Sequence, residues 1–354
     1  MFELASGQEV LSHFDLAMQQ RFLPSGRVRW FPMSEVGDDG SIRSTMSGEQ
    51  ASVSAKKVVD ATYSQMRVPS IDPPSYGIDS GVTCIPPNDL PRRGAGHDQY
   101  VVVGAGKTAM DTCIWLLDNG TPPDHIRWIV PRDSWLLDRR NYQPGEEYFA
   151  KVCKGLADQV EAVAVADTID DTFLELEERE FLARIDPSVE PEAYHCAVIS
   201  PGELDQLRSI TDVVRLGRVT HLTPDEIVLE RGTVAATTNP LYIDCSAQGI
   251  PRRPAKPIFD GDRITPQWVR TCQPTFSAAF VGHVEAAYDD DDIKNELCQP
   301  IEPPEVPLDY LRMFQRELAT RTCWDRYPEV RTWLETCRLD PFSSVAKTRV
   351  GADA

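Results

Sequence analysis

The chain is poor in positive charge. Its 354 residues include 36 lysines and arginines against 55 aspartates and glutamates, which gives a net charge of −19 at pH 7. Nucleic acids and anionic membrane surfaces both need basic patches, so neither is expected as a partner. No stretch reaches the roughly 20 apolar residues of a membrane span, and the first residues lack the features of a secretory signal. These absences predict a cytoplasmic protein.

The sequence also lacks the paired spacings that bind metals or relay electrons through thiols. Its nine cysteines include no C-x-x-C pair, and its six histidines form no H-x-x-x-H pattern. This usage predicts reduced, mostly buried thiols rather than a disulfide framework or a zinc site. It also argues against disulfide-reductase chemistry. No pattern identifies a catalytic residue, a substrate or an oligomeric state.

The most informative feature present is an apolar strand over 100–103 that stops at a glycine turn before an amphipathic helix expected over 108–120. The turn comprises Gly104, Ala105, Gly106, Lys107, Thr108 and Ala109. Gly104 permits the tight bend, Gly106 lacks the β-carbon that would hold a phosphate away, and Ala109 lets the helix pack closely. A second strand over 125–131 completes a βαβ unit. The pattern predicts a seat for a dinucleotide diphosphate at the helix N-terminus.

Two other interpretations of this turn stay open. A tight turn between packed elements needs no ligand at all. Gly106-Lys107-Thr108 also looks like the end of a P-loop, with the strand Leu241–Asp244 in the role of magnesium-binding strand. A P-loop, however, needs a glycine where this chain has Val101, which disfavours phosphoryl transfer.

The residues after the second strand bear on the choice of nicotinamide coenzyme. An arginine suits the 2′-phosphate of NADP, whereas a carboxylate suits the free ribose hydroxyls of NAD. Arg132 and Asp133 are adjacent here. We favour NADP because of Arg132, while Asp133 keeps NAD open and a solvated surface role for Arg132 is the simpler alternative.

The rest of the chain predicts an α/β protein. Apolar spacing over 9–20 predicts a helix packed on a core. The other expected elements are strands over 27–31, 41–46 and 55–61 in a small β-meander; a Pro/Gly-rich linker; helices over 145–184; a capped helix from Ser200 to about 214; strands over 219–222, 226–229 and 241–245; and terminal helices from 308.

Two strand ends echo one another. Asp60-Ala61-Thr62 and Asp244-Cys245-Ser246-Ala247 each follow an apolar strand, and the chain then leaves through proline. Small residues at the carboxyl end of a strand allow a ligand to lie against the backbone. The alternative is ordinary turn chemistry at both places.

With the glycine turn between these strand ends, and Arg132 and Trp135 after it, the chain resembles the two-dinucleotide flavoprotein oxidoreductases of the pyridine nucleotide-disulfide oxidoreductase superfamily. The flavin-containing-monooxygenase-like branch is the most similar. The resemblance covers most of residues 1 to about 300. It implies an FAD domain interrupted by an NAD(P) domain, and hydride transfer from NADPH to FAD in an NADP- and FAD-dependent oxidoreductase.

The resemblance also implies roles for individual residues. The glycine turn and Arg132 match the nicotinamide site, with Trp135 after it. The two crossover strand ends match Ala61, Thr62, Ser246 and Ala247, and the segment that closes over the flavin matches Gln273 and Phe276.

Two departures from this pattern matter. No G-x-G-x-x-G for FAD precedes the nicotinamide motif, and Tyr63 replaces the glycine of the first crossover. Either the chain is an N-terminally shortened member, or it is a nicotinamide-dinucleotide-binding remnant without flavin or turnover.

The expected fold is therefore a Rossmann-type NAD(P)-binding domain inserted in an incomplete FAD-binding Rossmann-like domain with a β-meander. The predicted divisions are 1–67 for the partial FAD-type domain, 68–98 for the linker, 99–215 for the NAD(P)-binding domain, 216–305 for the returning FAD-type domain and 306–354 for C-terminal helices.

Overall fold

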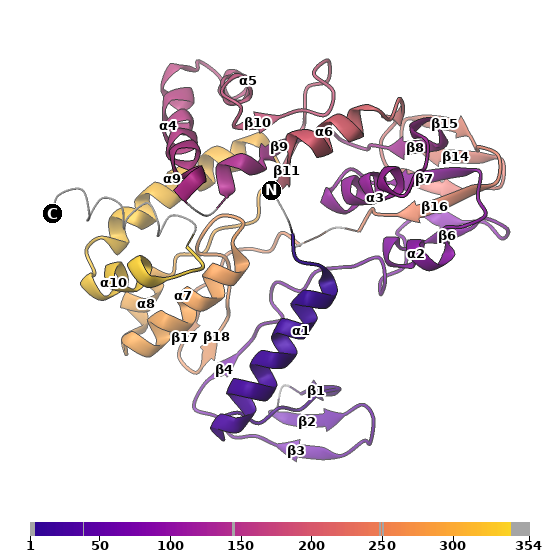
Figure 1. Ribbon diagram of the computed structural model, residues 1–354. Coiled ribbons are helices and arrows are strands. Elements are labelled where there is room, and N and C mark those ends of the chain that lie inside the picture. The colour runs from indigo at the N-terminus through magenta and orange to yellow at the C-terminus, as the bar shows by residue number, and fades with distance from the viewer. Residues whose placement is uncertain (1–3, 38, 144–145, 248, 250, 341–354) are drawn as a thin grey trace. The chain divides into compact units, whose positions relative to one another are not determined.

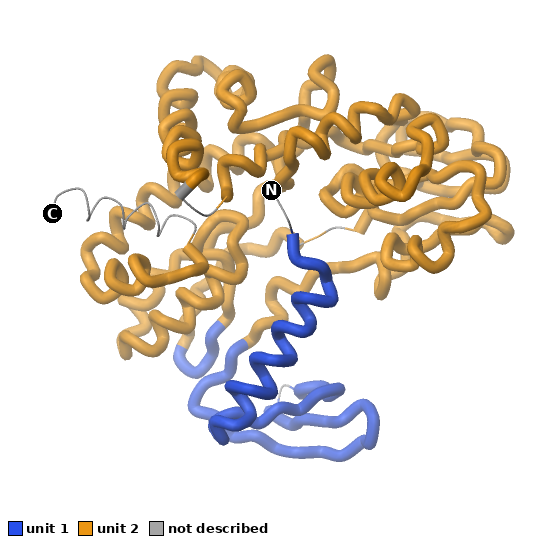
Figure 2. The backbone as a smooth tube through the Cα atoms, viewed as in Figure 1, with its two compact units in different colours: residues 1–59, 261–264 blue, residues 60–260, 265–354 orange. Residues whose placement is uncertain are grey.

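The computed structural model describes residues 4–37, 39–143, 146–247, 249 and 251–340 (Figure 1). The chain separates into two compact units (Figure 2). Unit 1 comprises residues 1–59 and 261–264, and unit 2 comprises residues 60–260 and 265–354. Across the described ranges, no helix combines the length and apolarity that crossing a membrane requires.

Unit 1 contains the predicted helix and a small antiparallel sheet. Helix α1 spans Gly7–Ala17, and Ser6 caps it by accepting a hydrogen bond from the Glu9 amide. The strands are β1 (Ser34–Val36), β2 (Ser41–Ser44), β3 (Gln50–Ser52), β4 (Val58–Val59) and β18 (Arg263–Ile264). Strands β1, β2 and β3 form an antiparallel sheet in that order, while β4 and β18 pair in parallel. Of the three strands predicted for the meander, only the one over 41–46 is confirmed. No strand forms over 27–31, and the strand within 55–61, β4, pairs with β18 instead of joining the meander.

The expectation that the first helix packs on a core is also wrong. No residue of α1 is buried, and Leu11 and Phe14 are 65% and 62% exposed. Helical spacing of apolar residues shows that a helix has an apolar face but not what covers that face. In the described part of residues 4–59, no side chain is buried.

Unit 2 is built on a five-stranded sheet in which every neighbouring pair is parallel. Its order is β12 (Asp212–Val214), β8 (Ile126–Ile129), β7 (Gln99–Val103), β16 (Pro240–Asp244) and β6 (Cys84–Ile85). Helix α3 (Lys107–Asp118) connects β7 to β8 as predicted. The chain returns to the other side of β7 with β16, so the strand order reverses between β7 and β16. In open α/β sheets, ligands bind at the carboxyl ends of the strands at such a reversal.

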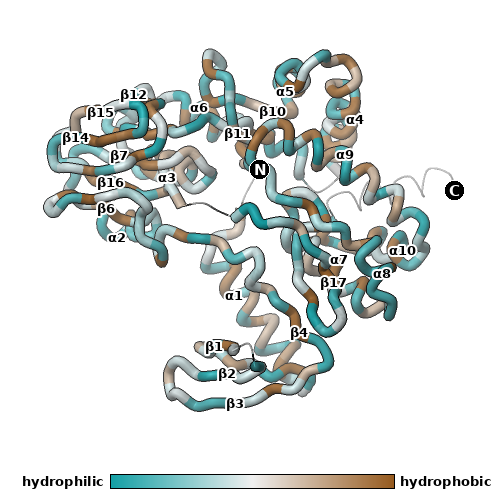
Figure 3. Tube along the Cα trace, turned by 180° about the vertical axis from the view of Figure 1, so that it is seen from behind, coloured by the Kyte–Doolittle hydropathy of each residue, from teal (hydrophilic) through white to brown (hydrophobic). Residues whose placement is uncertain are grey.

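Two layers cover this sheet. Val102 of β7 faces a core shared with α3 and α6 (Pro201–Arg208), whereas Val101 and Val103 face a core shared with β13 and β14. That second layer is an antiparallel arrangement of β15 (Gly232–Ala235), β14 (Glu226–Leu229) and β13 (Val219–Leu222), with β5 (Gly77–Ile78) parallel to β13. Both β7 and β14 are coloured as hydrophobic in Figure 3. The fold is α/β with a central parallel sheet, as predicted.

The remaining part of unit 2 surrounds a small sheet in which β9 (Ser134–Asp138) lies between β10 (Leu182–Ala183) and β11 (Ala193–Ile199). Its core brings together side chains of β9, β11 and three helices, α4, α5 and α9. The other elements here are α4 (Phe149–Val165), α5 (Ile169–Glu178), β17 (Phe259–Asp260), α7 (Pro274–Ala287), α8 (Asp291–Leu297), α9 (Pro307–Trp324) and α10 (Pro328–Thr336).

Several segments differ from expectation. The stretch expected to be a linker contributes β5, β6 and α2 (Leu90–Arg93) to unit 2. The capped helix α6 ends at Arg208, and residues 212–214 form β12 instead of its last turn. Strands β13, β14 and β16, expected in the returning FAD-type domain, lie in the sheets around β7. The insertion of one domain in another stays a prediction.

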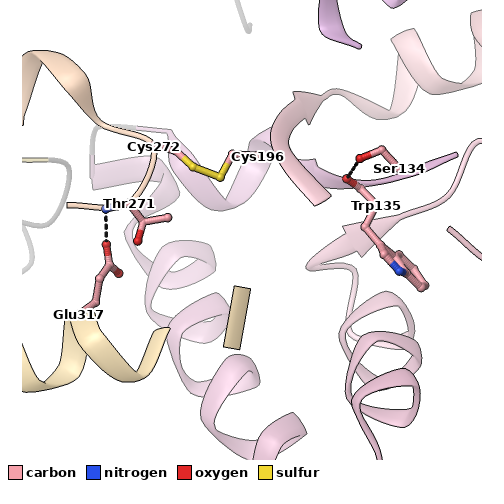
Figure 4. Close-up of a disulfide and its surroundings, with 6 residues drawn as sticks. All are labelled: Ser134, Trp135, Cys196, Thr271, Cys272 and Glu317. Carbon is pink, nitrogen blue, oxygen red and sulfur yellow. Dashed lines mark hydrogen bonds between the residues drawn. A yellow bond between two sulfur atoms is a disulfide. The ribbon is translucent and has the colours of Figure 1, made fainter. Parts of the chain in front are cut away.

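The expectation of free thiols is wrong for two cysteines. Cys196 of β11 and Cys272, just before α7, form a disulfide across 76 positions of sequence (Figure 4). Both residues have a φ of +55°, a left-handed conformation that non-glycine residues seldom adopt. The seven other cysteines are free. Spacing in the sequence could not reveal this bridge, because the two cysteines become neighbours only through the tertiary fold.

Candidate functional site

Gly104 closes the carboxyl end of β7 against two neighbouring strands. Its φ is +128°, and a β-carbon here would lie 2.5 Å from the carbonyl oxygen of Cys245. The Gly104 amide donates to the carbonyl of Ile129 at 3.0 Å, and the buried Trp128 indole donates to the carbonyl of Gly104 at 2.7 Å. Only glycine fits this position, so the tight bend predicted from the sequence is confirmed.

Gly106 has the opposite surroundings. A β-carbon at Gly106 would meet nothing within 4 Å, and both Gly106 and Thr108 are exposed. Gly106 is the N-cap of α3, and no side chain caps that helix. Ala109 is fully buried against the strand, as the third small position predicts. The amides of Ala109 and Met110 donate to the carbonyl of Gly106, whereas those of Gly106, Lys107 and Thr108 donate to no other described residue.

Lys107 lies in a network of charges between α3 and α6. Its ammonium contacts Asp111 and lies 3.6 Å from Glu203, which in turn accepts from Arg139 at 2.8 Å. Burial alone would raise the pKa of Glu203, but hydrogen bonds from Ser200 and the Arg139 and Lys107 cations outweigh it and lower the pKa to about 2. The lysine is thus held by carboxylates, which differs from the free phosphate-binding lysine of a P-loop.

The strand end after β16 lies directly beside the glycine turn. Asp244 is buried and accepts from the amide and hydroxyl of Ser246 at 3.1 and 2.6 Å, and from the hydroxyl of Tyr76 at 3.1 Å. Burial, with Cys84 and Asp244 nearby, raises the pKa of Tyr76. Ser246 and Ala247 are half-buried. The structure therefore brings the second predicted strand end to the glycine turn.

The first strand end has the same local geometry in a different place. Thr62 donates to Asp60 from its amide at 3.1 Å and from its hydroxyl at 2.7 Å, which reproduces the pattern of Ser246 and Asp244. Ala61 and Thr62 follow β4, however, and β4 pairs with β18 rather than with the five-stranded sheet. The two similar sequences therefore form the same kind of turn, and the role of Ala61 and Thr62 in binding a ligand stays a prediction.

Arg132 and Asp133 have separate surroundings. Asp133 accepts two hydrogen bonds from Arg215, at 2.8 and 3.1 Å, and its side chain is 9% exposed. Arg132 is 31% exposed and pairs with Glu305 at 3.3 Å. Arg215 follows β12, the neighbour of β8, so the sheet order brings it to the strand end that carries both candidate residues. The Asp133 carboxylate is therefore already hydrogen-bonded to Arg215, whereas the Arg132 side chain remains partly accessible to solvent.

The three remaining predicted residues lie in or next to other cores. Trp135 is 3% exposed and packs on Phe173. Phe276 is 1% exposed and packs against Phe280 and other aromatic rings of α9 and α10. Gln273 is the N-cap residue of α7, and its side-chain oxygen is buried without a hydrogen-bond partner. The contacts of these residues do not join them to the glycine turn.

A cleft elsewhere in unit 2 is a poor alternative site for a dinucleotide. It has a volume of about 630 Å³ and lies at the N-terminal ends of α5 and α9. Asp170, Glu190 and Glu192 are among its lining residues. Three carboxylates would repel a diphosphate.

Four residues of the site were missed by sequence reasoning: Trp128, Arg215, Glu305 and Glu203. The alternation of the strand over 126–129 could have placed Trp128 inside the sheet, but not on the carbonyl of Gly104. Arg215 and Glu305 reach residues 132 and 133 from distant parts of the chain, and no spacing signals such contacts.

Comparison with known proteins gives relatives but no function. No family model matches the sequence. Uncharacterized proteins of Mycobacterium bovis and Mycobacterium tuberculosis are 48% identical to this chain over 338 residues, which cover 96% of this chain and 63% of each relative. The chain thus spans less than two thirds of the length of these relatives.

Among solved structures, L-lysine 6-monooxygenase from Pseudomonas syringae matches at 13% identity with a TM-score of 0.32, over 70% of this chain and 59% of that chain. A likeness at this level does not establish a shared fold.

Proposed function

We propose that this chain binds NADPH at the turn between β7 and α3, and that it forms the nicotinamide-binding part of a flavin-dependent oxidoreductase. When bound, the nicotinamide would supply a hydride to an acceptor. The role of the chain's own residues is to bind and orient the coenzyme.

The contrast between Gly104 and Gly106 carries the proposal. Gly104 is glycine because the fold demands it, since a side chain there would collide with Cys245. Gly106 has no such steric reason, because the space beside it is open and its backbone is extended with φ −79° and ψ 176°. A glycine that the fold does not need, at an uncapped helix N-terminus, is suited to a phosphate that approaches the backbone.

The surroundings of Arg132 and Asp133 favour NADP over NAD. A carboxylate that binds the ribose hydroxyls of NAD must be free to accept hydrogen bonds. Asp133 instead accepts two from Arg215. Arg132 pairs at 3.3 Å with a half-exposed glutamate, and exposed ion pairs of this kind are worth only about 0–1 kcal/mol. A 2′-phosphate can therefore displace Glu305 from Arg132 at small cost.

The flavin part of the proposal comes from the sequence resemblance. Within the described residues 4–37 and 39–98, no strand is followed by a glycine turn and a helix, so this region offers no second cradle for the diphosphate of FAD. Tyr63, in the position of a crossover glycine, has its ring beneath Lys256 at 4.1 Å and Arg253 at 5.3 Å. We therefore assign no residue to flavin chemistry.

The coenzyme proposal is tested by titrating the purified chain with NADPH in a calorimeter, alongside Gly106→Val and Gly7→Val. Gly7 begins α1 and also has open space around it, so it controls for placing a branched side chain at a helix start. We expect wild type and Gly7→Val to bind NADPH equally, and Gly106→Val to bind at least about tenfold more weakly. Equal binding by all three proteins, or none by wild type, would contradict the proposal.

The flavin proposal has its own test. The purified chain is mixed with FAD, passed over a desalting column and examined for the visible absorbance of bound flavin. Retained flavin that NADPH bleaches without oxygen would support an oxidoreductase. A colourless protein that still binds NADPH would favour the alternative, a nicotinamide-dinucleotide-binding protein without flavin.

A further inference from the structure

Glu305 lies on a proline-containing strap, which we define as residues 300–306. The Ile301 amide donates to the carbonyl of Trp268 at 2.6 Å, and the carbonyl of Glu305 accepts from the Tyr194 amide at 3.1 Å. The Glu305 amide donates to the carboxylate of Asp309 at 3.0 Å. These hydrogen bonds hold the strap on both sides of Pro303 and Pro304, so the backbone of Glu305 has a defined position.

The strap brings this carboxylate to the arginine expected to bind the coenzyme. Tyr194, which holds Glu305, pairs with Trp135 in the register of β11 and β9. Residue 132 lies just before β9, so Glu305 reaches Arg132 across one strand pair, with 3.3 Å between Oε1 and the guanidinium. The pairing of β11 with β9 therefore fixes the backbone positions from which the Arg132 and Glu305 side chains approach one another.

We infer that Glu305 is a specificity-determining residue that competes with the 2′-phosphate of NADPH for Arg132 and so limits the preference for NADPH over NADH. The inference rests on the proposed coenzyme site. A phosphate monoester carries about −1.5 to −2 charges near neutral pH. The 2′-phosphate must displace the Glu305 carboxylate from the Arg132 guanidinium, and after binding it stays close to that negatively charged carboxylate. NADH has neutral hydroxyls in place of the phosphate and meets no such repulsion.

The local charges point the same way. Asp133 is neutralised by Arg215, so it adds little to the field at Arg132. Burial and the cations of Arg132 and Arg218 lower the pKa of His195 and outweigh Glu305, which raises it, so this imidazole adds little positive charge near pH 7. Glu305 is therefore the carboxylate whose removal should change the charge that a 2′-phosphate encounters.

The test compares Glu305→Gln with Glu302→Gln. The two glutamates lie on the same strap and are 42% and 41% exposed, but Glu302 pairs with Arg252 instead of Arg132. Each variant loses one negative charge, so the comparison separates net charge from position and from the partner of each glutamate, which is Arg132 for Glu305 and Arg252 with the Ala255 amide for Glu302. Wild type and both variants are titrated with NADPH and with NADH at low salt, where surface charges act most strongly.

We expect Glu305→Gln to bind NADPH about 3- to 10-fold more tightly than wild type and NADH within about twofold of wild type. Glu302→Gln should resemble wild type with both coenzymes. In an Arg132→Gln background, Glu305→Gln should raise NADPH affinity by less than it does with Arg132 present, because the carboxylate and the phosphate no longer compete for one guanidinium.

Different results identify which claim fails. If wild type binds neither coenzyme, the proposed function and the inference both fail. If wild type binds NADPH but Glu305→Gln leaves the ratio of NADPH to NADH affinity unchanged, only the inference is overturned. An equal gain in Glu302→Gln would also overturn it, since the effect would then be one of net charge.

Discussion

Replacing Gly104 with alanine should destabilise unit 2 strongly. The new β-carbon would lie 2.5 Å from the Cys245 carbonyl oxygen and 2.8 Å from its carbonyl carbon, on a backbone with φ of +128°. Both obstacles are backbone atoms of the adjacent strand end, so no side chain can turn aside. The only relief is to separate β7 from β16 at their carboxyl ends.

The expected cost follows from two contributions. An alanine held in a sparsely populated conformation costs about 1–3 kcal/mol, and overpacking a tight contact costs about 1–3 kcal/mol. The free energy of unfolding should therefore fall by about 2–6 kcal/mol. A natural domain is stable by only about 5–15 kcal/mol, so the change should be obvious in urea unfolding followed by circular dichroism.

Gly282→Ala is the matched control. Gly282 lies inside α7, is exposed, and has no atom within 4 Å of the position that a β-carbon would take. The same substitution there should stabilise the protein by about 0.5–1 kcal/mol, because glycine is a poor helix former. Wild-type stability in Gly104→Ala, or a loss of equal size in both variants, would refute the reasoning about the β7 turn.

Three further predictions concern charge and cross-linking. Arg215→Met should free Asp133 and so reduce the preference for NADPH over NADH in titrations; an unchanged preference would contradict the assigned role of that pair. The same variant should lower the free energy of unfolding by about 1–3 kcal/mol, because the Asp133 carboxylate loses its hydrogen-bond donor. Because the pKa of Glu203 is lowered to about 2 in the folded state, its stabilising contribution is complete above about pH 4.5 and is lost as the pH falls towards 2. Acid titration should therefore bring Glu203→Gln and wild type to equal stability, and a constant difference would be evidence against this. Cys272→Ser should cost about 2–4 kcal/mol, since the disulfide with Cys196 spans 76 positions, and reductant should destabilise wild type but not the variant.

The sequence predicted best what short-range patterns encode. The βαβ unit around Gly104, the open position at Gly106 and the buried Ala109 all follow from residue size and spacing within twenty or so positions. The capping box at Ser200 and strands β13 and β14 follow for the same reason. The α/β fold class could be predicted from the sequence because these local signals agree with one another.

The rest depends on contacts between distant segments. The strand order that brings Cys245 against Gly104 requires the tertiary fold, as does the disulfide of Cys196. The clamp of Arg215 on Asp133 is of the same kind, and it changes how the two residues after β8 are interpreted. From the sequence alone, the adjacent residues Arg132 and Asp133 left both NADP and NAD possible. The hydrogen bonds from Arg215 to Asp133 support the proposal of NADP.

The most direct test of the coenzyme site is amide hydrogen exchange with and without saturating NADPH. The account predicts slower exchange at residues 105–108, where the chain enters α3 and the amides donate to no other described residue. Amides of the meander β1–β3 should be unchanged. Unaltered exchange at residues 105–108, or protection confined to other segments, would contradict the claim that this turn holds the diphosphate.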